Sequence, residues 1–274
     1  MFARILPIAR VTFLEALRQR FFGFLLVLAL ALTLASLPLK AIDFGNQELK
    51  FLADLGFGVM LLLGSVLAVV LPAQLLYAEL DNRTALTLLA KPVGRAEFLL
   101  GKFLGAWAVL AVFAVAVAAL IGAILALREP EVAARAARLD LAPPELSFPG
   151  LAAHALLQVV RLGVVAAMTL MLGALARTFL YTVVVGAMAV LAGQLIWVAQ
   201  EALQRPDHGA VLKSVLWMST RLFPNLQGFN IGEALVLAPG TVEAGTVPAL
   251  LLAGAAYLLL FLVLGWLAFR RREI

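Results

Sequence analysis

The sequence has no cysteine, only two histidines and few charged residues. Without cysteine the chain can form no disulfide, thiol redox centre, cysteine nucleophile or cysteine-ligated metal site. His154 and His208 alone leave little capacity for a histidine-built metal site. Charged residues make up 14% of the 274 residues and hydrophobic ones 64%, whereas soluble domains average about 25% and about 45–50%. The composition therefore predicts an integral membrane protein.

Six apolar runs are long enough to cross a bilayer, which takes about 20 residues. The run at 151–176 is interrupted by His154 and Arg161, and five others contain no charged residue or histidine: 21–39, 55–78, 103–127, 178–200 and 247–269. We expect an all-α integral membrane protein in which residues 1–274 form one domain of six transmembrane helices. Residues 4–20 place most apolar and charged side chains on opposite faces, with Arg10 in the apolar sector, which predicts an amphipathic helix lying in the inner membrane interface. The alternative is a solvated leader with helical tendency.

Basic residues are distributed unevenly among the segments that link the runs. The N-terminus, 79–102, Arg177 and the C-terminal tail hold 12 Lys and Arg against 5 Asp and Glu. The segments 40–54, 128–150 and 201–246 hold 8 against 11. Because basic residues near span ends stay on the cytoplasmic side, both termini are predicted to be cytoplasmic. The net charge of +5 is then explained by the excess of Lys and Arg in the cytoplasmic segments, and no nucleic-acid partner is expected.

The cytoplasmic segment 79–102 is the most informative part of the chain. It begins polar, is leucine-rich at 86–89 and reaches Pro92. Asp81 or Asn82 can cap a short helix, Pro92 would end it, and another helix could start near Arg95. Exposed leucines without a core of their own form a candidate docking surface for a partner. The alternative is a polar turn with a frayed helix.

Gly101 and Lys102 resemble the end of a P-loop, but the pattern is incomplete. It requires Gly at position 96 and Ser or Thr at 103, where Ala96 and Phe103 stand. No other stretch supplies a nucleotide site, so ATP, if used, binds to another chain. We expect no catalytic residue and no metal site in this chain.

Polar residues are rare in the predicted spans. His154, Gln158 and Arg161 are spaced i, i+4 and i+7 and share one helix face, and Gln194 lies at a similar depth in the next run. A charge near mid-membrane must face protein or water. These residues either line a substrate path or subunit seam, or form hydrogen bonds that only fix the bundle.

The outer segment 201–246 is long and only partly polar. Residues 211–219 can form a short amphipathic helix that Phe223-Pro224 would end. Such a segment either dips back into the outer membrane and caps the bundle, or rests on the headgroups. Irregular backbone at depth requires protein or water to satisfy it.

Three segments together resemble the permeases of type-2 ABC transporters, and in particular their NosY-like branch. Residues 9–18 are similar to the N-terminal interfacial helix of that family. Residues 79–102 are similar to its stretch between spans two and three, with an acidic residue, a Thr, a Leu pair, Pro, a basic residue and Gly-Lys. Residues 222–230 resemble an outer motif of the NosY-like branch.

The resemblance implies two permeases, identical or paralogous, in contact with membrane lipid and with a dimer of cytoplasmic ABC ATPase subunits that hold ATP and Mg²⁺. This chain would bind no cofactor itself. It implies export of an unidentified substrate across a bacterial inner membrane, with a coupling helix at 82–90 and re-entrant outer helices within 211–235. The implied ATPase-coupling residues are Glu79, Asp81, Asn82, Arg83, Thr84, Leu86, Leu88, Leu89, Pro92 and Arg95. Candidates for the substrate path or permease seam are His154, Gln158, Arg161 and Gln194.

Other classes of membrane protein fit the sequence less well. An intramembrane enzyme needs a Ser–His pair or an acidic metal cluster, and neither is evident. An ion-coupled secondary carrier usually keeps an acid at depth, whereas no predicted span contains Asp or Glu. A non-transporting scaffold or assembly factor stays open as the main alternative, and the substrate cannot be read from the sequence.

Overall fold

The computed structural model describes residues 2–38, 48–81, 94–140, 145–204 and 209–271, and every regular element in these ranges is a helix. This agrees with the predicted all-α fold. The elements are α1 (Phe2–Leu17), α2 (Arg20–Leu34), α3 (Glu48–Asp81), α5 (Arg95–Arg138), α6 (Phe148–Leu175), α7 (Phe179–Gln204), α8 (Ala210–Leu222), η3 (Gln227–Phe229), α9 (Gly232–Leu237) and α10 (Thr246–Arg271).

Five of the described helices are long and apolar enough to cross a membrane: α3, α5, α6, α7 and α10. A sixth candidate is the pair α1–α2, which is bent by 62°. Alone, the 15 residues of α2 extend about 22 Å, less than the hydrocarbon thickness of about 30 Å. The structure therefore gives five or six candidate spans, and the interfacial position of α1 stays a prediction.

Helix α5 is much longer than the apolar run within it. Its 44 residues extend about 66 Å, and they include Pro130 and the first part of the predicted outer segment 128–150. The extension is rich in alanine, the strongest helix former, so the helix continues past the end of the apolar run. At the other end, α5 begins at Arg95 as predicted, and Glu97 Oε2 accepts a 3.0 Å hydrogen bond from the Gly94 amide.

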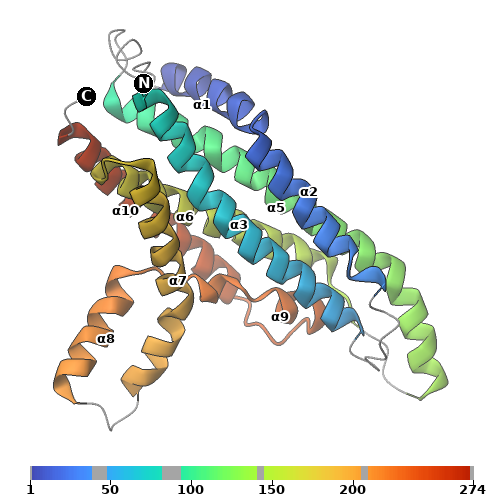
Figure 1. The fold of residues 1–274 in the computed structure, drawn as a ribbon. Helices are drawn as coiled ribbons and strands as arrows, with labels where there is room; N and C mark the ends of the chain where they lie inside the picture. The colour runs from blue at the N-terminus through green and yellow to red at the C-terminus, as the bar shows by residue number, and fades with distance from the viewer. Residues whose placement is uncertain (1, 39–47, 82–93, 141–144, 205–208, 272–274) are drawn as a thin grey trace.

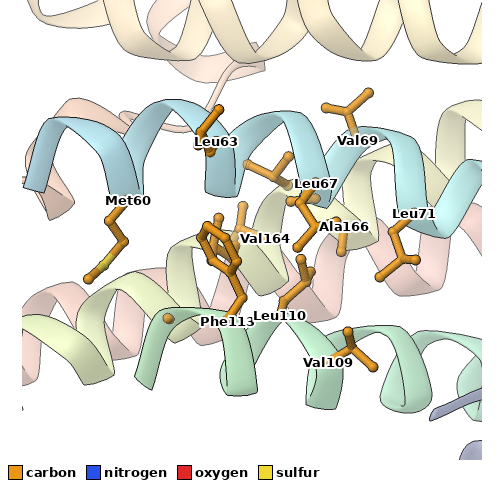
Figure 2. Close-up of a cluster of buried hydrophobic side chains, with 14 of the residues drawn as sticks. Met60, Leu63, Leu67, Val69, Leu71, Val109, Leu110, Phe113, Val164 and Ala166 are labelled. Carbon is orange, nitrogen blue, oxygen red and sulfur yellow. The ribbon is translucent and has the colours of Figure 1, made fainter. Parts of the chain in front are cut away.

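The apolar core lies between α3, α5 and α6. Figure 2 shows part of it, with Met60 and Leu67 of α3 beside Leu110 and Phe113 of α5 and Val164 of α6, all buried. Every residue of α6 from Arg161 to Leu170 is buried, so α6 is the central helix of the bundle. By contrast, α7 and α10 keep many exposed apolar side chains, which suits contact with lipid or another subunit.

The start of α1 and the end of α10 lie at one end of the bundle, together with the end of α3 and the start of α5 (Figure 1). We call this the terminal end. Helices α8 and α9 lie toward the opposite end, and α8 runs beside α7 (Figure 1). The charge asymmetry of the sequence predicts that the terminal end is cytoplasmic.

The chain after α8 returns to the middle of α7. As predicted, α8 ends just before Phe223 and Pro224. The Leu226 amide then donates a 3.0 Å hydrogen bond to the Gly193 carbonyl, and a Cβ at Gly193 would lie 2.9 Å from the Pro224 carbonyl oxygen. Glycine is required at this approach because a side chain would collide with the returning backbone.

Candidate functional site

Three of the ten predicted ATPase-coupling residues are described by the structure, and these three lie at the terminal end. The other seven fall outside the described residues: Asn82, Arg83, Thr84, Leu86, Leu88, Leu89 and Pro92. Of the three, Glu79 and Asp81 lie in the last turn of α3 and Arg95 lies at the first position of α5. The last turn of α3 and the first two turns of α5 thus flank segment 82–93, and we call these turns its stems.

A buried lysine joins three helices at these stems. Lys102 of α5 is 2% exposed, and its Nζ lies 2.5 Å from Glu79 Oε1 of α3 and 3.4 Å from Glu15 Oε2 of α1. A buried ammonium is strongly unfavourable unless paired, so the two carboxylates keep α1 and α3 close to α5. Sequence reasoning did not assign a site role to Lys102 or Glu15, although Glu79 and Lys102 bracket the segment that it singled out.

The first helix packs closely on α5 beside this lysine. A Cβ on Gly105 would lie 2.7 Å from the Ala9 carbonyl oxygen and 2.6 Å from Thr12 Cβ, so only glycine permits the crossing. Thr12 and Ala16 are buried, whereas Leu6 and Val11 are exposed. The close crossing and the ion pairs hold α1 to the stem of α5.

Arg95 contacts the end of α10 within the chain, and its ATPase-coupling role stays a prediction. Its guanidinium donates hydrogen bonds to the carbonyl oxygens of Phe269, at 3.4 Å, and Arg270, at 2.6 Å. These carbonyls belong to the last turn of α10, where a cation is favourable. Arg95 therefore links the stem of α5 to the end of the last helix.

His154, Gln158 and Arg161 all lie in α6 and are all buried, while their role at a substrate path or permease seam stays a prediction. Arg161 donates from Nη1 to Gln158 Oε1 at 3.2 Å and from Nη2 to Ser65 Oγ of α3 at 2.7 Å. Gln158 Nε2 in turn donates to the Phe229 carbonyl of η3 at 3.3 Å. Sequence reasoning missed Ser65 and Phe229, because nothing local to them indicates a partner on α6.

His154 stands apart from this hydrogen-bonded chain. Its ring packs against Phe57 with a centroid distance of 4.4 Å, and neither ring nitrogen has a hydrogen-bond partner among the described residues. Over the same residues, no group of three or more His, Asp or Glu side chains could hold a metal ion.

A groove of about 370 Å³ lies between α3 and α7. Nine aliphatic side chains within Leu61–Val70 and Val183–Leu191 line it, together with Ser65 and Gln194. Gln194, predicted at the depth of the α6 polar residues, thus belongs to the groove, and its Nε2 has no partner in the described structure. Ser65 connects the two sites, since it lines the groove and accepts from Arg161.

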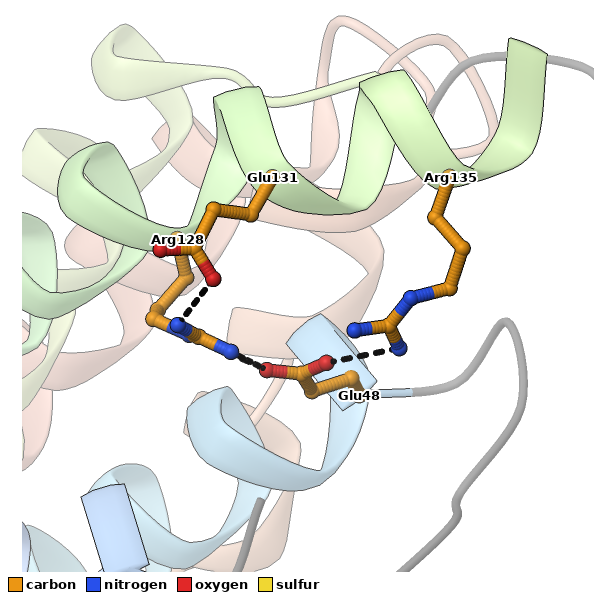
Figure 3. Close-up of polar contacts among 4 residues, drawn as sticks. All are labelled: Glu48, Arg128, Glu131 and Arg135. Atoms are coloured by element: carbon orange, nitrogen blue, oxygen red, sulfur yellow. Dashed lines mark hydrogen bonds and ion pairs between the residues drawn. The ribbon is translucent and has the colours of Figure 1, made fainter. Parts of the chain in front are cut away.

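At the opposite end, ion pairs tie the first turn of α3 to its neighbours. Figure 3 shows Glu48 between Arg128 and Arg135 of α5, with Glu131 also paired to Arg128. Arg128 Nη2 lies 2.5 Å from Glu48 Oε1, and both side chains are buried. Lys50 also pairs with Glu233 of α9 at 2.7 Å, on the surface.

Comparison with known proteins gives one finding on relationship. No curated protein matches the chain significantly. Residues 7–274 match the family model described as ABC-2 family transporter protein. The match covers nearly the whole chain, and the described structure supplies several helices able to cross a membrane. The chain therefore belongs to the ABC-2 transporter family, as a multi-pass, non-catalytic permease subunit of an ABC transporter.

Proposed function

We propose that this permease is one of two, identical or paralogous, in an exporter of the bacterial cytoplasmic membrane. Both termini lie in the cytoplasm, where a dimer of ABC ATPase subunits holds ATP and Mg²⁺ and performs the hydrolysis. The observation that carries this proposal is the buried Lys102, which ties both stems of segment 82–93 to α1. A docking segment with fixed stems can transmit a displacement into the bundle.

Coupling then runs through the two stems. Closure of the ATPase dimer pushes on residues 82–90, whose Leu86, Leu88 and Leu89 supply the apolar contact, and Asn82, Arg83 and Thr84 supply its polar rim. The displacement enters α3 at Glu79 and Asp81 and enters α5 beyond Pro92, at Arg95. Helix α1 lies in the inner interface and braces the stems.

The seam between the two permeases is proposed at the α3/α7 groove. The groove is apolar and lies at mid-helix, and the exposed apolar side chains of α7 continue its surface. An apolar face of this kind is covered by a partner or by lipid. Gln194 in the groove, and the Arg161–Gln158 pair behind Ser65, supply the few polar groups beside the substrate path, while His154 packs against Phe57.

The outer segment is proposed to be re-entrant, and residues 222–230 support assignment to the NosY-like branch. The amide of Leu226 and the side chain of Asn225 both bond to α7, the latter to Gln200 Oε1 at 3.1 Å. Polar groups satisfied in this way are compatible with a position inside the membrane. The copper link that the branch name suggests is not part of the proposal.

The first test is purification from native membranes in mild detergent, followed by mass spectrometry. A near-stoichiometric ATPase subunit with a P-loop is the expected companion. If no ATPase is recovered even after gentle crosslinking, the coupled-permease proposal is wrong, and the scaffold alternative takes its place.

A double variant tests the docking segment itself. Leu88→Asp with Leu89→Asp should release the ATPase or uncouple its hydrolysis from transport, because two buried charges at an apolar contact are strongly unfavourable. The control is Leu139→Asp, which changes an exposed leucine just beyond the other end of α5. Full coupling in the double variant would contradict the assignment.

A further inference from the structure

Three basic side chains are buried in the described structure: Lys102, Arg128 and Arg161. Lys102 and Arg128 each pair with carboxylates. For Arg161, by contrast, no carboxylate partner occurs among the described residues, and its Nε has no hydrogen-bond partner there. Its neighbours Gln158 and Ser65 are neutral, so no side chain in the described part of the chain neutralises the positive charge of Arg161.

This charge lies directly behind the wall of the α3/α7 groove. Arg161 Nη2 donates to Ser65 Oγ at 2.7 Å, and Ser65 lines the groove. In this structure the Ser65 hydroxyl donates its one proton to the Leu61 carbonyl, and turned toward the groove it can donate to an anionic group instead. Such a group, about 3 Å from Ser65 Oγ, would be roughly 6 Å from the guanidinium. In a low-dielectric interior, the guanidinium attracts an anionic group strongly at that separation because little water screens the two charges.

The groove also has the shape and lining for an aliphatic body. Its lining runs from Leu61 to Val70 on α3 and from Val183 to Gln194 on α7, which is about 14–16 Å along the helices. Its volume of about 370 Å³ lies within the range of about 300–1,000 Å³ for small-ligand pockets. Gln194 also lines the groove, and its Nε2 is buried and has no partner in the described structure. Rotation of this side chain would bring that donor to a ligand group in the groove.

We infer that the groove takes a single-chain anionic amphiphile as the transported substrate, with its aliphatic chain along α3 and α7 and its anionic group beside Ser65 and Gln194. The anion supplies the countercharge that Arg161 lacks. The claim that this amphiphile is transported rests on the proposed function. The binding preference itself depends only on the groove and on Arg161.

The test compares three pyrene-labelled probes of equal chain length: an alkyl sulfonate, an alcohol and an alkylammonium. Binding is measured with the full-length permease in nanodiscs of a zwitterionic lipid. The sulfonate should bind roughly 10- to 100-fold more tightly than the alcohol, the size expected for one charge at about 6 Å and an effective dielectric constant of about 20. The alkylammonium should bind most weakly. Equal binding of sulfonate and alcohol overturns the inference.

Two variants test which residues cause the preference for the sulfonate over the other two probes. Arg161→Gln should remove the preference and leave the alcohol affinity unchanged, which a merely structural role for Arg161 would not predict. Because loss of a buried residue can impair folding, Gln194→Glu is the second variant. It places a negative charge in the groove at a partly exposed position, and should reverse the order of sulfonate and alkylammonium. An unchanged order in Gln194→Glu overturns the inference.

Val66→Trp is the control for the groove, since Val66 lines it and a larger side chain should weaken binding of all three probes alike.

Adding phosphatidylglycerol to the nanodiscs separates a substrate from a bilayer lipid. If this lipid displaces the sulfonate, the groove is a lipid site and the substrate assignment is wrong. None of these measurements needs the ATPase, so their failure leaves the proposed function intact. Absence of an ATPase from the purification would refute the proposed function, and with it transport of the amphiphile, but not the binding preference of the groove.

Discussion

At the residue scale, the two lysines that form ion pairs in the described structure separate buried from exposed charge. Lys102 is 2% exposed and holds two carboxylates, whereas Lys50 is 47% exposed and holds one. Removing one partner from a buried pair leaves the other charge without compensation, while surface pairs contribute little. The two residues therefore form a matched pair for mutagenesis.

Lys102→Met should destabilise the fold by about 2 kcal/mol, below the figure of about 3–5 kcal/mol for a fully buried pair, because Glu79 and Glu15 are 17% and 40% exposed and can hydrate. For a chain of this size that lowers the melting temperature by about 4–8 °C, measured on the purified permease. Lys102→Arg should restore most of the loss, and Lys50→Met should change little. Equal effects of the two Lys→Met variants would mean that burial does not determine the role of Lys102.

At the element scale, α3 is fastened to α5 at both of its ends. Glu48 pairs with Arg128 at one end, and Glu79 pairs with Lys102 at the other. Between these pairs the two helices share the apolar core shown in Figure 2. We therefore expect α3 and α5 to move together when the transporter changes state.

Glu48→Gln should lower the stability of this helix pair by about 2 kcal/mol, because Arg128 then loses its buried carboxylate and keeps only Glu131. Thermal unfolding of the purified chain checks the effect. Glu131→Gln is the control, since the Glu131 side chain is 62% exposed and should matter little. A larger loss in the control would show that Glu48 is not the central member of the network.

The α1–α5 crossing gives a second prediction for an element. Gly105→Leu forces a side chain against the Ala9 carbonyl and should detach α1 locally, at a cost of about 1–3 kcal/mol for overpacking. Because the chain has no native cysteine, Thr12→Cys offers a clean reporter, as Thr12 is 1% exposed. Maleimide labelling of that reporter should increase in Gly105→Leu. It should not increase in Gly23→Leu, where a Cβ meets nothing within 4 Å.

At the scale of the whole molecule, the charge distribution predicts the orientation in the membrane. In intact cells, a membrane-impermeant maleimide should label a Glu243→Cys variant, because residue 243 is exposed in the outer segment. It should label an Arg177→Cys variant only after permeabilisation, since Arg177 belongs to the cytoplasmic set. The reverse pattern would place both termini outside the cytoplasm.

The helical class and the approximate spans were readable from the sequence because they depend on local composition. A run of about 20 apolar residues must satisfy its backbone within itself, so it forms a helix wherever it lies in the bilayer. The residues at which each helix begins and ends were harder to predict. Helix α5 extends well past its apolar run, and residue 128 was assigned to an outer segment although it begins a helical extension paired to α3.

The candidate sites divide in the same way. Spacing alone put His154, Gln158 and Arg161 on one face, because i, i+4 and i+7 coincide on any α-helix. The sequence had no signal for Ser65 as the partner of Arg161, 96 residues away, or for Glu15 and Lys102, 87 residues apart. It also did not separate Gln194, which belongs to the groove, from the residues of α6.

By itself, then, the sequence determined the membrane class, the helical content, the expected orientation and the resemblance to ABC permeases, since each follows from composition or from short-range spacing. Only the tertiary structure decided which charges are neutralised and which is not. Pairing of Lys102 and Arg128 with carboxylates, and the lack of such a partner for Arg161 among the described residues, depend on how separate helices cross. Those crossings arise from close packing of side chains over long sequence distances, which a linear pattern does not encode.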